Sequence, residues 1–148
     1  NLAFLPHFQE MSEEAFVALA NFKPLRKEFL LRMGRTGFPK AEMEAALDKL
    51  GRTVERMDIW FAESGGPYLM GGQLTLADIA VMPVIVRMAD INLDDAWTKR
   101  PAIARWLEAI RGEAPFAPTY YRGTQLTEKY PHLALLRAQG HKSVQAAT

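Results

Sequence analysis

A short segment near the middle of the chain carries every device that begins a helix. Thr75 suits the N-cap, and Asp78 lies three residues later, so each side chain can bond the other residue's backbone N–H as a capping box. Leu74 and Ile79 have the spacing of a hydrophobic staple across that start. Residues 79–86 contain no polar side chain, so we expect this helix to be buried all round. A buried helix start needs its own cap, and we therefore assign Asp78 a structural role and not a catalytic one.

Apolar residues at helical spacing, bounded by capping residues, glycines and prolines, predict an all-α chain. The predicted helices are residues 12–22, 24–33, 39–63, 76–89, 101–111 and 126–138, with a short aromatic segment at 115–121. Short connections favour an antiparallel helical bundle around the buried helix. We expect residues 1–139 to form a single helical domain whose first helix is cut, with only its end near residues 1–10. The polar residues 140–148 are expected to be a flexible tail.

The longest predicted helix carries an apolar seam in steps of four and three. Its members are Met43, Leu47, Leu50, Val54, Met57 and Phe61. Such a seam packs against another helix, but it can face the core, a further domain or a second subunit. Gly51 inside this helix costs about 1 kcal/mol relative to Ala, which suggests close helix packing at that point.

Composition excludes several classes of site. The chain has no Cys, so it can form no disulfide, thiolate metal site or cysteine nucleophile, and this is compatible with a cytoplasmic location. The histidines His7, His132 and His141 are scattered, and we expect no metal site. A net charge of +1, spread along the chain, gives no case for nucleic acid. No apolar run approaches the roughly 20 residues of a membrane span.

Two further sequence features lie around the capping box. A Gly-rich turn with a Tyr-Leu pair, residues 65–72, precedes it, and a run opening with Pro101 and carrying Trp106 follows it. Together with the box, these segments resemble the C-terminal helical domain of glutathione transferases. Residues 11–16 and 34–39 are similar to segments of the bacterial β-aryl-etherase type of that family. The resemblance spans roughly residues 8–115.

The resemblance implies a division of labour between two domains. In this family a thioredoxin-like domain holds glutathione and the catalytic Ser, Cys or Tyr, and the helical domain lines the pocket for a hydrophobic electrophile. No alternating strand pattern precedes the first helix here, and the chain opens on Asn1, so we expect the thioredoxin-like domain to be absent. The parent enzyme would conjugate glutathione to electrophiles or cleave aryl ethers with it. This chain alone would hold no catalytic residue and no cofactor, and it would be inactive.

By the same resemblance, aromatic residues near the two ends of the domain would line the pocket for the hydrophobic co-substrate. The matching residues are Phe4, His7, Phe8, Phe116, Tyr120 and Tyr121. Aromatic rings with a few polar tips suit aryl substrates, but ordinary core packing explains the same residues. The alternative function is a non-catalytic helical module that docks other proteins. An exposed apolar face would also favour a homodimer or other self-association.

Overall fold

The computed structural model describes residues 1 and 3–138, and its elements within these residues are all helical. The elements are α1 (Leu5–Gln9), α2 (Glu13–Phe22), η1 (Pro24–Arg26), α3 (Lys27–Met33), α4 (Lys40–Ser64), α5 (Leu76–Asp90), η2 (Asp94–Trp97), α6 (Pro101–Gly112), α7 (Phe116–Thr119), α8 (Leu126–Lys129) and α9 (Pro131–Ala138). The predicted all-α class is confirmed. The tail predicted at residues 140–148 lies outside the described residues.

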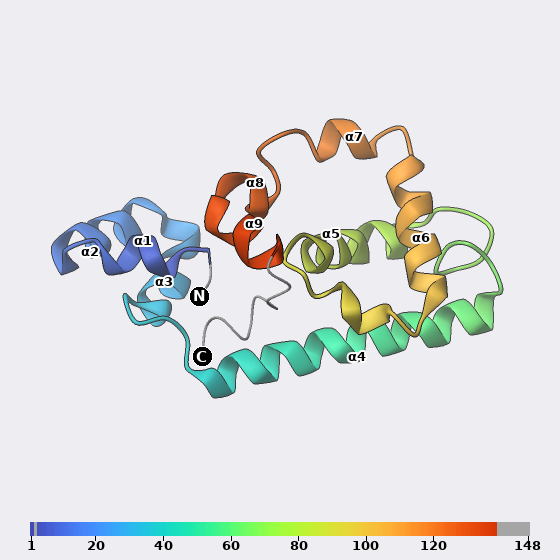
Figure 1. Ribbon diagram of the computed structural model, residues 1–148, viewed down its shortest axis with the longest axis horizontal. Helices are drawn as coiled ribbons and strands as arrows, with labels where there is room; N and C mark the ends of the chain where they lie inside the picture. The colour runs from blue at the N-terminus through green and yellow to red at the C-terminus, as the bar shows by residue number, and fades with distance from the viewer. Residues whose placement is uncertain (2, 139–148) are drawn as a thin grey trace.

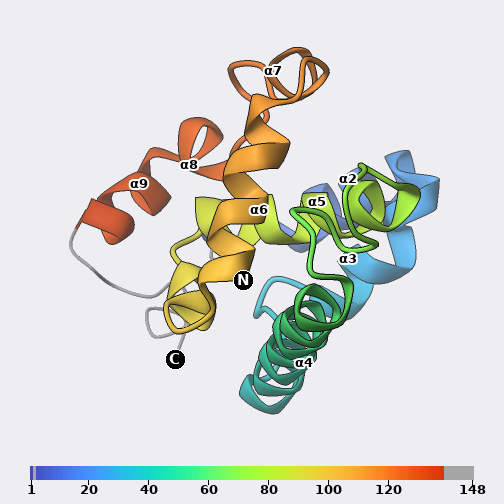
Figure 2. The ribbon, with the colours of Figure 1, turned by 90° about the vertical axis from the view of Figure 1, so that its right-hand side faces the viewer.

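The long helix α4 runs along one side of the molecule, and the other helices are arranged over it (Figure 1). Helices α5 and α6 lie above α4, with α7 beyond the end of α6 and the α8–α9 pair near the end of α5. Helices α1, α2 and α3 form a group of their own beside the start of α4. Figure 2 shows the same molecule from the side, with α6 crossing its middle and α8–α9 on one flank.

The larger hydrophobic core lies between α4, α5 and α6. Trp106 and Ile103 of α6, Ile85 of α5 and Met57 of α4 are all fully buried there. The second half of the α4 seam, from Val54 to Phe61, therefore faces the core. This is the first of the three alternatives given for the seam. In the first half, Leu47 and Leu50 are only partly buried against this core.

A second hydrophobic core holds α1, α2 and α3 together. Its buried members are Phe8, Phe16, Ala20, Leu30 and Met33. The aromatic rings of Phe8 and Phe16 meet edge to face, with centroids 5.2 Å apart. Two separate cores thus lie within the range that we predict to be a single domain.

Two predicted helices are divided in the structure. Residues 24–33 form the 3₁₀ helix η1 and then α3, because Pro24 suits a first turn and such turns commonly begin α-helices. Residues 126–138 form α8 and α9, separated at Tyr130. Tyr130 precedes Pro131 and is extended, at φ −123° and ψ 92°, because the proline ring disfavours helical geometry in the residue before it.

The expectation that the inner helix is buried all round is wrong for its first half. In α5, Ile85, Val86 and Met88 are buried, but Leu76 is 82% and Ile79 is 49% exposed. The described neighbouring helices therefore leave some apolar side chains of this first half exposed. Gly51 of α4 also differs from expectation. A Cβ atom there would meet no atom of another described element within 4 Å, so no described helix packs closely against it.

Candidate functional site

The start of α5 is locked by the buried carboxylate of Asp78. Asp78 and Thr75 have the reciprocal arrangement of a capping box. Oδ2 of Asp78 accepts the backbone N–H and the hydroxyl of Thr75, at 2.9 Å each. Oδ1 accepts the Leu69 N–H from the preceding turn and the indole N–H of Trp106 from α6, also at 2.9 Å each. One side chain thus joins the α4–α5 turn, α5 and α6.

These hydrogen bonds decide the ionisation of Asp78. Burial by itself acts to raise the pKa of this carboxyl, because it disfavours the charged form. The bonds from Leu69, Thr75 and Trp106 outweigh that effect and lower the pKa below its ordinary value of 3.8. The carboxylate is therefore ionised near neutral pH, has no proton to donate, and has both oxygens engaged. This geometry supports a structural role for Asp78.

The end of α5 carries a second buried carboxylate, Asp90, whose partners in α8 are not indicated by any local sequence pattern. Asp90 is 3% exposed. Its Oδ2 accepts the Leu126 N–H at 2.7 Å and Arg87 Nη1 at 2.6 Å. Its Oδ1 accepts the Thr127 hydroxyl at 2.5 Å and the Thr127 N–H at 3.3 Å. Asp90 thereby fixes the first turn of α8, and Arg87 also donates to the Thr124 carbonyl at 3.3 Å.

The structure brings the N-terminal aromatic residues together. Phe4 and Phe8 stack with ring centroids 6.1 Å apart, and Phe4 meets the Tyr130 ring edge to face at 5.6 Å. Phe4, His7 and Phe8 all line one cavity of about 300 Å³. The other described lining residues are Leu19, Lys23, Arg26, Phe29, Leu30, Lys129 and Tyr130. We call this the α1–α8 cavity.

The C-terminal aromatic residues lie elsewhere, with Phe116 in α7 and Tyr120 and Tyr121 directly after that helix. Phe116 and Tyr120 stack with centroids 4.6 Å apart, and Phe116 lines a cavity of about 250 Å³ with Leu74, Ile79 and Met82. Burial raises the pKa of Tyr120 above its ordinary value of 10.0. Tyr121 is 66% exposed. Among the described cavities, none is lined by residues of both predicted substrate-binding groups. We call the cavity that Phe116 lines the α5–α7 cavity.

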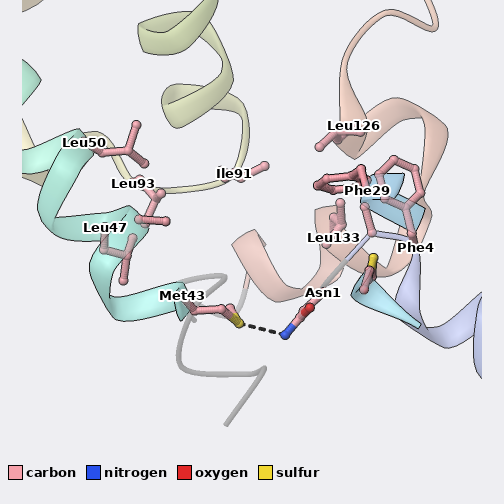
Figure 3. A pocket seen from close by; sticks show the side chains of 13 residues that line it. Asn1, Phe4, Phe29, Met43, Leu47, Leu50, Ile91, Leu93, Leu126 and Leu133 are labelled. Atoms are coloured by element: carbon pink, nitrogen blue, oxygen red, sulfur yellow. Dashed lines mark hydrogen bonds between the residues drawn. The ribbon is translucent and has the colours of Figure 1, made fainter. Parts of the chain in front are cut away.

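A third cavity of about 300 Å³ lies between the group α1–α3, the start of α4 and the α8–α9 pair (Figure 3). Leu47 and Leu50 face it from α4, and Phe4, Phe29 and Leu133 face it from the other side. Asn1 is the polar residue among the described lining residues. Its side-chain amide donates to the Phe38 carbonyl at 2.9 Å and accepts the Phe38 N–H at 2.7 Å. We call this the α3–α4 cavity.

The sequence did not predict the α3–α4 cavity, because its walls come from segments far apart in the chain. The one available signal was the first half of the α4 seam, which continues beyond the part that the core covers. Within residues 1 and 3–138, no group of three or more His, Cys, Asp or Glu side chains is placed to hold a metal ion. None of the described helices is long and apolar enough to cross a membrane.

Fold and site together define an all-α domain in which a buried carboxylate locks an inner helix and apolar cavities lie between the helices. The family model for the glutathione S-transferase C-terminal domain matches residues 11–114, and the chain belongs to this family. The predicted resemblance is therefore confirmed at the level of the family.

One relative supports the same assignment. The chain is similar to the glutathione S-transferase-like protein OpS6 of Beauveria bassiana (strain ARSEF 2860), at 32% identity over 84 residues. The match covers 53% of this chain and 38% of that protein. No solved structure matches the chain. Neither match separates a β-aryl etherase from other members of the family, so that part of the resemblance stays a prediction.

Proposed function

We propose that this chain is the co-substrate-binding domain of a glutathione transferase whose thioredoxin-like domain lies outside the printed sequence. Glutathione and the catalytic side chain would belong to that other domain. Support comes from the family match, which is to the C-terminal domain. In this proposal the 148-residue chain supplies the apolar walls of the pocket for the electrophile. The reacting groups belong to the other domain.

The reaction that we propose for the whole protein is a substitution by the glutathione thiolate. The thiolate sulfur forms a bond to an electrophilic carbon and the leaving group departs with its bonding electron pair. With an aryl halide the leaving group is halide. With an aryl ether the C–O bond breaks, a phenolate leaves, and it takes a proton from water. Both reactions give a thioether of glutathione.

The observation that carries the proposal is the aromatic lining of two cavities between helices. Phe4, His7 and Phe8 line the α1–α8 cavity, and Phe116 lines the α5–α7 cavity with the Tyr120 ring stacked on it. Cavities of this kind between helices are common sites for aryl ligands. Either group can serve as the co-substrate wall, and a binding experiment distinguishes them.

The test is a titration of the 148-residue chain with glutathione and, separately, with an aryl halide, followed by backbone amide NMR shifts. We expect no tight glutathione binding, no turnover, and aryl-halide shifts around His7 or around Phe116. The variants His7→Gln and Phe116→Leu should each weaken binding only if their own cavity is the site. Robust conjugation by this chain alone would overturn the proposed division of roles.

One observation favours the alternative, a non-catalytic module that docks other proteins. The turn before α5 and the start of that helix expose apolar side chains, with Met70 68% and Leu76 82% exposed. Exposed apolar patches mark interaction surfaces. The upstream coding sequence discriminates: a thioredoxin-like segment with a catalytic Ser, Cys or Tyr supports the enzyme, and its absence supports docking.

Self-association is part of the proposal. Phe22 of α2 is 84% exposed and Leu25 of η1 is fully exposed, so a second apolar surface is available for a homodimer. Sedimentation of the chain at several concentrations, beside the variant Phe22→Ser, tests this. A cytoplasmic location also stays a proposal, which cell fractionation of the native protein would check.

A further inference from the structure

The α1–α8 cavity combines an aromatic lining with a cationic rim. Phe4, Phe8 and Tyr130 contribute rings, and Phe4 contacts both of the others. The cavity volume is about 300 Å³. A cavity of about 150 Å³ accommodates benzene, so this space suits a flat molecule of one or two fused rings.

Three cations line the same cavity from three elements. They are Lys23 at the end of α2, Arg26 of η1 and Lys129 of α8. No Asp or Glu is among its described lining residues. Within the described part of the chain none of the three cations forms an ion pair, although the Lys129 ammonium lies 5.7 Å from the Tyr130 ring centroid. No described carboxylate therefore lies within ion-pair distance of these three cations.

The neighbouring α3–α4 cavity differs from the α1–α8 cavity in its charged side chains. Phe4 and Phe29 line both cavities and form a shared wall. No charged side chain is among the described lining residues of the α3–α4 cavity, whose walls are aliphatic, aromatic and thioether groups apart from Asn1. The two cavities have similar volumes and differ in their charged side chains, because cationic side chains are among the described lining residues of the α1–α8 cavity alone.

We propose that the α1–α8 cavity binds an aromatic anion, specifically an aryl carboxylate of one or two rings. The ring system packs between Phe4, Phe8 and Tyr130, and the carboxylate faces Lys23, Arg26 and Lys129. This inference rests on the proposed function only in that it names the ligand class for one of the two cavities offered there. Guanidinium and ammonium groups donate charge-assisted hydrogen bonds to carboxylates, which favours the anion over a neutral analogue of the same shape.

The expected effect of each cation is moderate because all three are exposed. Single exposed ion pairs contribute little, so removing one cation should weaken binding about two- to fivefold. Salt screens such charges, so the preference for the anion should shrink as ionic strength rises. Removing all three should abolish the preference for the anion while leaving the aromatic contribution in place.

The experiment compares 2-naphthoate with 2-naphthamide, which has nearly the same shape and no charge. Both are titrated into the 148-residue chain, without glutathione, by calorimetry and by amide NMR shifts. We expect naphthoate to bind at least tenfold tighter at low salt, with shifts around His7 and Tyr130. The variants Lys23→Gln, Arg26→Gln and Lys129→Gln, alone and combined, should reduce that ratio stepwise. The control Lys99→Gln removes an exposed cation outside the cavity and should leave it unchanged.

Equal affinity for the two ligands, or an unchanged ratio in the triple variant, would overturn the inference. Far-ultraviolet circular dichroism of each variant checks that it is folded, and residual naphthamide binding checks that the aromatic wall is intact. The two proposals fail separately. Anion selectivity without any aryl-halide binding would remove only the proposed co-substrate role, and aryl-halide binding without anion selectivity would remove only this inference.

Discussion

The two ends of α5 each carry a buried aspartate that accepts four hydrogen bonds. The two carboxylates connect α5 to different parts of the molecule. Asp78 joins the α4–α5 turn to Trp106, which is fully buried in the larger core. Asp90 joins α5 to Leu126 and Thr127 of the short helix α8. The same chemistry therefore stabilises the whole core at one end and positions one peripheral segment at the other.

The difference follows from what surrounds the donors. Leu69 and Trp106, which donate to Asp78, belong to the larger hydrophobic core. The donors to Asp90 in α8 belong to neither core. Losing Asp78 should thus lower the free energy of unfolding of the entire domain, whereas losing Asp90 should release α8 while the core persists.

The largest expected effect is that of Asp78→Ala. It leaves the N–H groups of Leu69, Thr75 and Trp106 without their acceptor in a buried site, and we expect a loss of about 3–5 kcal/mol in the free energy of unfolding. Urea unfolding followed by tryptophan fluorescence measures it. The control Asp48→Ala, exposed on α4, should change stability by less than about 0.5 kcal/mol. A loss of that small size for Asp78→Ala would contradict the central role of this carboxylate.

The next effect is that of Gly66→Ala, in the turn that presents Leu69 to Asp78. A Cβ atom at Gly66 would lie 2.2 Å from the backbone carbonyl of Gly71. The turn must shift to relieve this clash, and we expect a loss of about 1–3 kcal/mol. Gly51→Ala is the matched control, because that helical site has open space, and there we expect a gain of up to about 1 kcal/mol. Equal signs for the two changes would refute this account of the turn.

A smaller and local effect is expected for Asp90→Asn. The amide keeps one acceptor oxygen and turns a donor toward α8, so the Leu126 and Thr127 N–H groups lose part of their bonding. Their protection from hydrogen exchange should fall about tenfold, while the Trp106 indole N–H stays protected. The exposed control Asp94→Asn should leave both probes unchanged. Loss of protection across the whole core would show that the two ends of α5 are not separable in this way.

The smallest effect is the acid dependence of stability. Because the folded-state pKa of Asp78 lies below its ordinary value of 3.8, the unfolded chain binds the proton first as pH falls. The contribution of this carboxylate is therefore fully present above that ordinary value and is lost as pH decreases through the folded-state pKa. Urea unfolding between pH 7 and pH 3 should show a shallower acid decline in Asp78→Asn than in the parent chain. Identical pH profiles would argue against a lowered pKa.

The same two residues show what the sequence can and cannot predict. Asp78 was predictable as a cap because its partner Thr75 is three positions away and capping follows a local pattern. Arg87, three positions before Asp90, is a local partner. The partners of Asp90 in α8 lie 36 and 37 positions away, and no local pattern indicates them. Trp106 as a donor to Asp78 is likewise 28 positions distant and was missed.

Cavities follow the same rule. The α1–α8 cavity joins Phe4 to Tyr130, and its aromatic members near the chain start came from family resemblance and not from spacing. Its cations were missed because charged residues at helix ends are ordinary in a sequence. Helix positions, by contrast, were largely predictable, since caps, prolines and 3.6-residue periodicity are all local.

Phe4 and Phe29 line both the α3–α4 cavity and the α1–α8 cavity. A ligand that rotates either ring into one cavity changes the volume of the other cavity. If an uncharged ligand in one cavity changes the affinity of the other cavity for an anion, the anion must change the affinity for the uncharged ligand by the same factor. We therefore expect a ligand in the α3–α4 cavity to change the affinity of the α1–α8 cavity through these two rings.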